Sequence, residues 1–405
     1  MVKVISGGVT AAKGFRAGGV YSGIRPNPDK TDMALIVSDV PGNAAAVYTK
    51  NKVKAAHIAV TKRHIANGVA QAVLCNSGNA NTCTPDGEEV AEMATVIAAK
   101  HLGISSDDVL PAATGVIGVP LPISPFEDAM PKLVSSLSAD GSAAAALAIL
   151  TTDTYIKEYA VQFEAGGKTC TLGGIAKGSG MIHINMGTML SFISTDCAIS
   201  KELVSKALHD EIADSFNQVS VDGDSSTNDT VVVIANGLAG NAEITEENPD
   251  YANFCEALHI VSTELSKMIA GDGEGCTKLL EAHVSGAPDK ETARLVSKSI
   301  ICSSLFKAAV FASDANWGRI LCAIGYTDAE FDVSDIDVYV KSEAGEVLVC
   351  KASASVPFDD DFATEILSQK HVTVEVDLHD GSEDAYAWGC DLTYDYVKIN
   401  GSYRS

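Results

Sequence analysis

One segment of the chain combines residue types that could do covalent chemistry. Residues 177–192 read KGSGMIHINMGTMLSF, with Gly187 directly before Thr188. A threonine hydroxyl is a poor nucleophile without a neighbouring base, and an N-terminal threonine finds that base in its own α-amine, whose reference pKa is about 8. Thr188 gains such an amine if its hydroxyl attacks the accessible carbonyl of Gly187 and the peptide bond is cut. On these residues alone, an ordinary β-forming threonine in a strand is the simpler interpretation.

The charge of the chain excludes some classes of partner. The 405 residues carry a formal net charge of -24, from 29 basic and 53 acidic side chains. Nucleic acids and membrane surfaces are polyanions and would repel such a chain, so we expect no nucleic-acid partner and no membrane partner. The sequence has no run of about 18 apolar residues and no secretory signal, which favours a cytoplasmic protein.

The cysteines and histidines indicate neither a disulfide framework nor a metal site. The ten cysteines include no C-x-x-C pair, and Cys75 and Cys83 are the closest two. Such spacing is typical of reduced thiols. The nine histidines show no zinc-binding spacing, so we expect no metal.

Strand-like and helix-like stretches alternate along the chain, which predicts an α/β or α+β fold. We expect strands over residues 32–39, 44–49, 56–62, 70–75, 230–236, 278–286 and 371–378, and a hairpin over 335–352. We expect helices over residues 86–103, 125–137, 142–150, 200–219, 250–271 and 289–310. No low-complexity linker or internal repeat marks a domain boundary.

A glycine-rich stretch resembles a phosphate-binding loop only superficially. Residues 271–278 read GDGEGCTK, but Thr277 precedes Lys278, whereas the Walker order places the lysine first. The stretch does place Glu274 between two glycines, where its carboxylate can be offered to a ligand with little crowding.

Two polar loops are further candidates for a site. Residues 222–229 read DGDSSTND and begin like a calcium loop, but Thr227 and Val233 occupy its glycine and glutamate positions, which excludes an EF-hand. Two interpretations of this stretch remain: a polar loop that only precedes a strand, or a loop whose residues support a site. Residues 75–83 read CNSGNANTC and follow a predicted buried strand, a place where loops often carry function.

Motifs along nearly the whole chain resemble the ornithine acetyltransferase family (glutamate N-acetyltransferases of arginine biosynthesis). The central motif is KGSGMIHINMGTMLSFISTD, and the others follow in the family's order: GGVTAAKGF, CNSGNANTCT, ATGVIG, TTDT, VDGDSSTNDT, GDGEGCTK, FKAAVFASDANWGRI and YVKINGSYRS. The chain departs from the family's usual proline at Ile184 and its usual alanine at Gly187.

The resemblance implies a chain that cuts itself between Gly187 and Thr188. It implies an α chain of residues 1–187 and a β chain of residues 188–405, in which roughly 188–285 complete the catalytic core and 286–405 form a C-terminal part. The implied fold is the DmpA/ornithine-acetyltransferase-like arrangement of layered helices and β-sheets with a smaller β-rich C-terminal part. The implied assembly is an α2β2 heterotetramer.

The resemblance also assigns roles to individual residues. It makes Thr188 the nucleophile and places Thr114 and Gly115 in the oxyanion hole. The positions that match the family's substrate contacts are Thr151, Lys177, Thr188, Glu274, Asn400 and Ser405. These roles suit the chemistry, because Lys177 can receive an α-carboxylate and Glu274 can pair with the side-chain ammonium of ornithine.

The implied reaction is a ping-pong transfer of acetyl from N2-acetylornithine to glutamate through an acetyl-threonine ester. It needs no metal or organic cofactor, and whether acetyl-CoA is also a co-substrate stays open. Two alternatives remain. One is an N-terminal-nucleophile hydrolase or aminopeptidase that passes the acyl group to water. The other is an uncut binding protein that does no chemistry.

Overall fold

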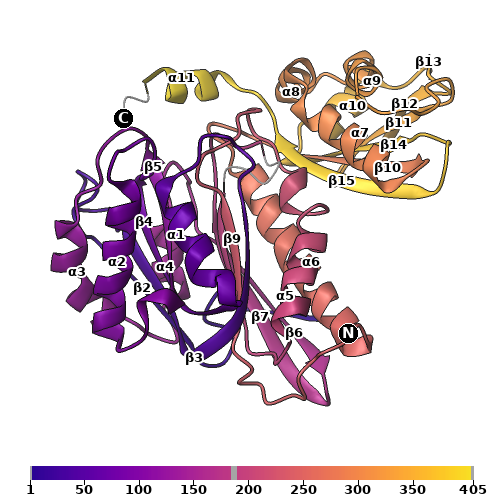
Figure 1. Cartoon of the computed structure of the whole chain (residues 1–405). Coiled ribbons are helices and arrows are strands. Elements are labelled where there is room, and N and C mark those ends of the chain that lie inside the picture. Colours follow the sequence, from indigo (N-terminus) through magenta and orange to yellow (C-terminus); the bar gives the residue numbers. More distant parts are fainter. Residues whose placement is uncertain (1, 184–188, 403–405) are drawn as a thin grey trace. The chain divides into compact units, whose positions relative to one another are not determined.

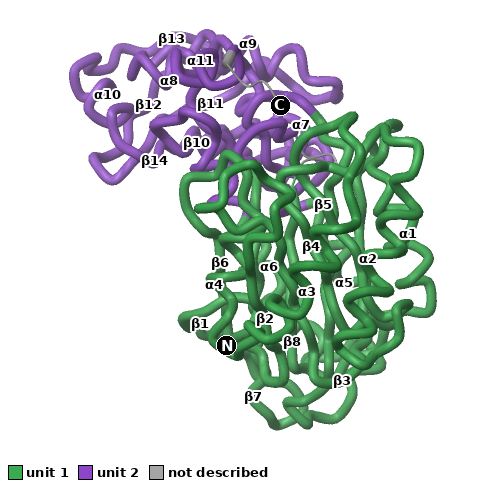
Figure 2. Tube along the Cα trace, turned by 90° about the vertical axis from the view of Figure 1, so that its left-hand side faces the viewer, with its two compact units in different colours: residues 1–178, 185–213, 225–265 green, residues 179–184, 214–224, 266–405 purple. Residues whose placement is uncertain are grey.

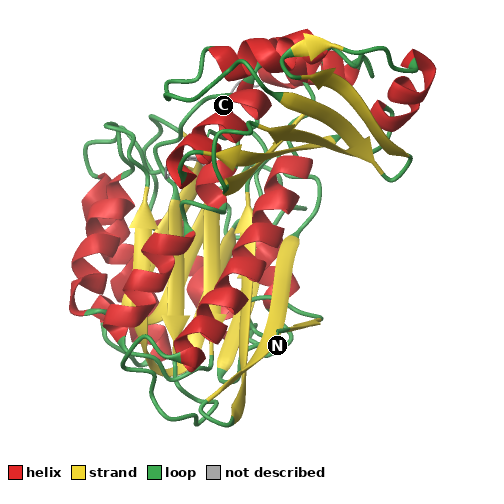
Figure 3. Ribbon diagram, turned by 90° about the vertical axis from the view of Figure 1, so that its right-hand side faces the viewer, coloured by secondary structure: helices red, strands yellow, loops and turns green. Residues whose placement is uncertain are grey.

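The computed structural model describes residues 2–183 and 189–402, which form two compact units that interleave along the sequence. Unit 1 comprises residues 1–178, 185–213 and 225–265, and unit 2 comprises residues 179–184, 214–224 and 266–405 (Figure 2). The mixed α/β fold predicted from the sequence is confirmed, with helices and strands in both units (Figure 3).

The described part of unit 1 is built on one nine-stranded sheet. Its strand order is β1-β6-β7-β8-β9-β3-β4-β5, and β2 also pairs with β3. The strands are β1 (Lys3–Ile5), β2 (Phe15–Val20), β3 (Met33–Tyr48), β4 (Val69–Asn79), β5 (Val109–Val116), β6 (Lys157–Ala165), β7 (Lys168–Lys177), β8 (Leu190–Thr195) and β9 (Thr230–Ala235). The pairs β4–β5 and β8–β9 are parallel, and the other pairs are antiparallel.

Strand β3 joins the two halves of this sheet. Its first residues, 33–37, pair with β2 and β4, and after a register shift residues 43–48 pair with β9. Backbone hydrogen bonds hold both of its ends: Ser77 donates to the Asp32 carbonyl (2.8 Å), and Thr49 donates to the Asp229 carbonyl (3.1 Å). The loop after β4 and the loop before β9 also meet directly, because the Asn228 amide donates to the Ala80 carbonyl (2.6 Å), and together they form one polar region.

Helices cover both sides of the sheet of unit 1 (Figure 1). They are α1 (Ala56–His64), α2 (Gly87–Leu102), α3 (Ser124–Ser135), α4 (Ser142–Ala148), α5 (Lys201–Glu211) and most of α6 (Pro249–Gly271), with 3-10 turns at Ile65–Asn67 and Ser106–Asp108. Alternate residues of β3 enter two cores: Ala34 and Ile36 pack with Ala145 of α4, whereas Met33 and Leu35 pack with α2 and α3. This alternation is the two-residue period of a strand buried on both faces.

The strand predicted over residues 56–62 is wrong, because this stretch is helix α1. Its buried residues include His57, Val60, Thr61 and His64, which follow the i, i+3, i+4, i+7 spacing of one helix face. That face packs against β5 and α2, so tertiary burial outweighs the weak helix propensity of the β-branched residues.

Unit 2 holds a six-stranded sheet in the order β13-β12-β11-β14-β10-β15. Its strands are β10 (Leu279–Ala287), β11 (Asp337–Ser342), β12 (Gly345–Lys351), β13 (Ala354–Ser355), β14 (His371–Asp377) and β15 (Glu383–Cys390). Its helical elements are the 3-10 turn Phe216–Gln218 and α7 (Lys290–Cys302), α8 (Ser304–Phe311), α9 (Trp317–Gly325), α10 (Asp360–Leu367) and α11 (Tyr394–Ser402). Helices α7 to α10 contribute apolar residues to one core with this sheet.

The single helix predicted over residues 289–310 is also corrected, since the chain leaves the helical conformation at Ser303 (φ -67°, ψ 106°). The Ser303 side chain accepts a hydrogen bond from the Phe306 N–H and so caps α8. Similarly, the helix predicted over residues 200–219 ends as α5 at Glu211.

Candidate active site

Polar residues of unit 1 gather where several strands begin or end. Lys177 is the last residue of β7 and pairs with Leu190, the first residue of β8, which pairs in turn with Thr230 at the start of β9. Gly187 and Thr188 lie outside the described residues, as does Ser405. The first described residue after that gap, Met189, accepts a hydrogen bond from the Thr230 N–H (3.1 Å).

The predicted oxyanion-hole residues lie at the end of β5. Gly115 has a φ of +134°, and a Cβ at this position would stand 2.3 Å from the Gly78 carbonyl carbon of β4. Only glycine fits such a backbone, both in conformation and in space. The neighbouring Thr114 is buried, and its hydroxyl accepts a hydrogen bond from the Lys177 ammonium (3.4 Å). The Thr114 hydroxyl therefore keeps its own proton to donate to a developing negative charge.

A buried carboxylate connects Thr151 with the chain around Lys177. Asp153 accepts hydrogen bonds from the Thr151 N–H (3.0 Å) and the Gly178 N–H (2.7 Å), and it forms an ion pair with Lys157 (2.8 Å) in which both side chains are fully buried. Burial alone would raise the pKa of Asp153, but Lys177 and Lys157 outweigh it and hold the carboxyl ionised. Asp153 thus holds the backbone of Thr151 and of Gly178, the residue directly after Lys177.

The Lys177 ammonium is buried and has both acidic and basic side chains near it. Burial is the largest influence and lowers its pKa, Lys157 lowers it further, and Asp153 and Asp229 raise it. For Asp229 the balance is reversed, since burial raises its pKa well above the usual range and the Met189 N–H and Lys177 only partly oppose this. Among the described residues, its buried Oδ2 atom has no hydrogen-bond partner, an environment that suits a protonated carboxyl better than a free charge.

In unit 2, Glu274 and Asn400 are in direct contact. The Asn400 side-chain amide donates to the Glu274 carboxylate (2.8 Å), and the Glu274 N–H donates to the Ser179 carbonyl (3.0 Å). A Cβ on Gly180 would stand 2.3 Å from the Glu274 carboxyl carbon. Glycine at position 180 therefore lets the backbone approach this carboxylate closely.

The stretch around Glu274 is not a phosphate-binding loop. The Lys278 ammonium donates to the Val310 carbonyl (2.6 Å) and the Ser313 hydroxyl (2.8 Å), while the Thr277 hydroxyl donates to Asp391 (2.5 Å). The two side chains that a Walker loop would direct to phosphate and magnesium are thus engaged inside the protein.

The structure brings together Thr114, Lys177 and, through Asp153, Thr151 in unit 1, and Glu274 with Asn400 in unit 2. Sequence reasoning missed Asp153, Asn228 and Asp229 as individual residues, although they lie in the stretches TTDT and VDGDSSTNDT that carry the family resemblance. The available signal was a cluster of polar residues directly before strand β9.

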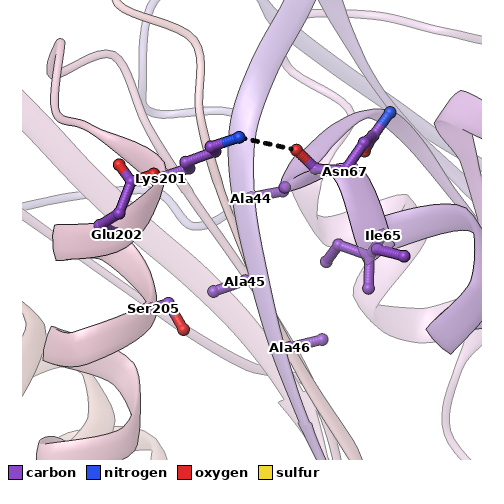
Figure 4. Close-up of a pocket in the computed structure, with 10 residues that line it drawn as sticks. Ala44, Ala45, Ala46, Ile65, Asn67, Lys201, Glu202 and Ser205 are labelled. Carbon is purple, nitrogen blue, oxygen red and sulfur yellow. Dashed lines mark hydrogen bonds between the residues drawn. The ribbon is translucent and has the colours of Figure 1, made fainter.

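Two other features of the described residues do not belong to this polar region. An open hollow of about 360 Å³ is lined by Ala44–Ala46 of β3, residues 65–68 and the first turn of α5, and Lys201 reaches the Asn67 carbonyl across it (Figure 4). It adjoins the start of β4, whereas the site lies at the end of that strand. Asp335, Asp337 and His379 of unit 2 have ligand atoms close enough for a metal, but Asp337 already accepts the Ala352 N–H.

Two further observations concern the cysteines and the helices of the described residues. All ten cysteines, each within the described residues, are free thiols. Burial raises the pKa of Cys75 beside the site to about 12, although Lys177 opposes this, so Cys75 is protonated and inert. Within residues 2–183 and 189–402, none of the helices combines the length and apolar composition needed to cross a membrane.

Comparison with known proteins gives matches along the whole chain. Residues 16–405 match the ArgJ family. The chain is 50% identical over 406 residues to the arginine biosynthesis bifunctional protein ArgJ 1 of Clostridium acetobutylicum, covering 100% of this chain and 99% of the relative. It is 47% identical over 405 residues to the ArgJ protein of Caldanaerobacter subterraneus subsp. tengcongensis, with both chains covered in full. A crystal structure of the ArgJ protein of Bacillus halodurans is 46% identical with a TM-score of 0.51, and it covers 53% of this chain and 100% of the solved chain.

Proposed function

The chain belongs to the ArgJ family, and we propose that it transfers an acetyl group from N2-acetylornithine to glutamate, giving ornithine and N-acetylglutamate for arginine biosynthesis. The observation that carries this proposal is the match over the full length to relatives named arginine biosynthesis bifunctional proteins. The contact between Lys177 and Thr114 supports it further, because it joins a cation to a hydroxyl donor, and Lys177 pairs with Leu190, two residues after Thr188 in the sequence.

Thr188 is the nucleophile of this reaction, and it becomes N-terminal when the chain cuts itself after Gly187. The fragments then have 187 and 405 − 187 = 218 residues, and the second is just over half of the chain. The solved Bacillus halodurans chain, which corresponds in full to 53% of this chain, has the length of such a fragment.

The α-amine of Thr188 takes the proton of the hydroxyl as its oxygen attacks the acetyl carbonyl of N2-acetylornithine. The Thr114 hydroxyl and the Gly115 N–H donate to the oxyanion, and fixed donors of this kind contribute about 2.7–4 kcal/mol each. The proton held by the α-amine passes to the leaving nitrogen, and ornithine departs from an acetyl-threonine ester. The amine of glutamate then attacks the ester, and N-acetylglutamate leaves as the Thr188 hydroxyl regains its proton.

The remaining residues bind the substrates. Lys177 receives the α-carboxylate, with Thr151 beside it, and Glu274, Asn400 and Ser405 bind the side chain of ornithine. The scheme uses no metal or organic cofactor. The relatives' description as bifunctional supports a second activity, acetylation of glutamate with acetyl-CoA as the donor. The assembly is a cytoplasmic α2β2 heterotetramer of the two fragments.

Two measurements test this function. Intact-mass analysis should find two fragments, and Thr188→Ala should give one folded, uncut and inactive chain; an uncut wild type would overturn the mechanism. Release of ornithine from N2-acetylornithine should accelerate with glutamate, because glutamate must remove the acetyl group from Thr188 before the enzyme can turn over again. Release at the same rate without glutamate, with acetate as the product, would identify a hydrolase instead.

A further inference from the structure

The outer edge of β5 has no neighbouring strand among the described residues, since β5 is the last strand of its sheet. Its carbonyl groups on that edge accept hydrogen bonds from side chains at every second residue. His64 contacts the Val109 carbonyl (2.8 Å), the Thr61 hydroxyl donates to the Pro111 carbonyl (2.6 Å), and Asn228 donates to the Ala113 carbonyl (2.8 Å). These contacts replace a strand neighbour, and the last of them lies directly before Thr114.

Both the nitrogen and the oxygen of the Asn228 side-chain amide form hydrogen bonds here. Besides Ala113, its Nδ2 donates to the Ala80 carbonyl (2.6 Å), and its Oδ1 accepts from the hydroxyl groups of Thr82 (3.0 Å) and Thr227 (2.5 Å). The residue is 5% exposed. An amide offers two donors and an acceptor with two lone pairs, so Asn228 is fully satisfied and joins the loop after β4, the end of β5 and the loop before β9.

We propose that Asn228 is the positioning residue of the oxyanion hole, because it fixes the peptide plane directly before Thr114 and Gly115. The proposal rests on the function proposed above. A peptide is planar, so holding the Ala113 carbonyl also holds the Thr114 N–H and limits the rotations that aim the Thr114 hydroxyl and the Gly115 N–H. Donors to an oxyanion act only when they are aimed in advance, and a misplacement of about 1 Å costs about 10²-fold in rate.

The main test is Asn228→Asp, which keeps the size of the side chain and removes both donors. Its carboxylate faces the carbonyls of Ala80 and Ala113, so the peptide before Thr114 should turn away. We expect kcat for acetyl transfer to fall about 10²-fold, with KM for N2-acetylornithine changed less than about threefold. A kcat within twofold of wild type in this variant would overturn the proposal.

Two controls separate positioning from ordinary stabilisation. Asn241 is a buried amide that donates to the carbonyls of Ala198 (3.1 Å) and Ala242 (2.8 Å) beyond the other ends of β8 and β9. Asn241→Asp should lower the melting temperature about as much as Asn228→Asp and leave kcat unchanged. Thr61→Val removes the bond to Pro111 on the same strand edge and should also spare kcat. Equal losses of kcat in Asn241→Asp and Asn228→Asp would reduce Asn228 to a structural residue and overturn the proposal.

If Asn228→Asp does not fold, two variants of Thr82 test the proposal instead. Thr82→Val removes one bond to the amide oxygen and should lower kcat by several-fold, whereas Thr82→Ser keeps the hydroxyl and should restore it. Equal kcat values in these two variants would contradict the proposal. A wild type that hydrolyses N2-acetylornithine without transfer would defeat the proposed function only, because hydrolysis uses the same oxyanion hole and the loss in Asn228→Asp would remain measurable. A wild type with neither activity would overturn both.

Discussion

The two groups of site residues are built in different ways. In unit 1, Thr114 and Lys177 stand at the ends of strands, and the Asp153–Lys157 ion pair beside them is fully buried. In unit 2, Glu274 stands in a loop between α6 and β10, and its carboxylate contacts a helix side chain, Asn400. The first group is fixed by a sheet and by charges, whereas the second is held by single hydrogen bonds.

This difference matches the degree of rigidity that the proposed reaction requires of each group. The donors to an oxyanion must not move during the reaction, which favours strand ends and buried ion pairs. The binding of substrate side chains must accommodate first ornithine, with an ammonium group, and then glutamate, with a carboxylate. Because Glu274 attracts the first and repels the second, a loop that can adjust suits it better than a strand.

The largest expected effect comes from the buried charges. Lys157→Met leaves the carboxylate of Asp153 without its nearest cation, and the free energy of unfolding should fall by about 3–5 kcal/mol. Lys278→Met is the counterpart in unit 2, where the partners are the neutral oxygens of Val310 and Ser313, and it should cost about 1–3 kcal/mol. Denaturant titration of both variants checks the ranking. Equal costs would mean that the two groups are equally rigid.

A second test exchanges one glycine in each group. Gly115→Ala puts a Cβ against the backbone of β4 at a φ of +134°, so we expect kcat to fall about 10²-fold as the oxyanion donors shift. In Gly180→Ala, the three atoms nearest to the new Cβ all belong to the end of the Glu274 side chain, which can rotate away. It should raise KM for N2-acetylornithine and leave kcat within a few-fold. Steady-state kinetics with separate kcat and KM values distinguish these outcomes, and a kcat loss in Gly180→Ala as large as in Gly115→Ala would contradict the contrast.

A smaller effect is expected from the charge of Glu274 alone. Glu274→Gln keeps an oxygen for the Asn400 amide but removes the partner of the ornithine ammonium. We expect KM for N2-acetylornithine to rise about tenfold, in line with about 1.5–3 kcal/mol for a hydrogen bond to a charged group. KM for glutamate should stay equal or fall, because repulsion of its side chain is relieved. A matched rise in both KM values would remove Glu274 from side-chain recognition.

The sequence predicts more of this site than of the interactions that hold it. Thr114, Lys177 and Glu274 stand in recognisable motifs, and the structure places each in a polar region. Asp153 contacts Thr151 and Lys157 locally, two residues before it and four residues after it. Its contact with Gly178 could not be predicted, because Gly178 reaches Asp153 only when β6 and β7 pair. Contacts across a sheet leave no periodic signal in one stretch of sequence.

The same limit explains the elements that were mispredicted. Residues 56–62 alternate enough to suggest a strand, and only their burial against β5 and α2 shows the helical period. The break at Ser303 is capped by the serine itself, a signal that is readable in SSLF but was hidden by the continuous helical pattern on either side. The bonds of Asn228 needed the three-dimensional meeting of two loops and a strand end.

The smallest expected effect concerns Asp229, the buried acid beside Lys177. Burial raises its pKa in the folded protein, so the protonated form is favoured by folding, and this contribution to stability is present below the unfolded pKa of about 3.9 and is lost as the pH rises through the folded pKa. Asp229→Asn keeps the neutral form at every pH. Its melting temperature should therefore exceed that of wild type by a margin that grows as the pH rises above the unfolded pKa of about 3.9, and its kcat should stay within a few-fold. A kcat loss of 10²-fold, or a difference in melting temperature that shrinks as the pH rises, would contradict this. Either result would mean that Asp229 is ionised in the folded protein and that its negative charge contributes to the site around Lys177, although its burial favours the neutral carboxyl.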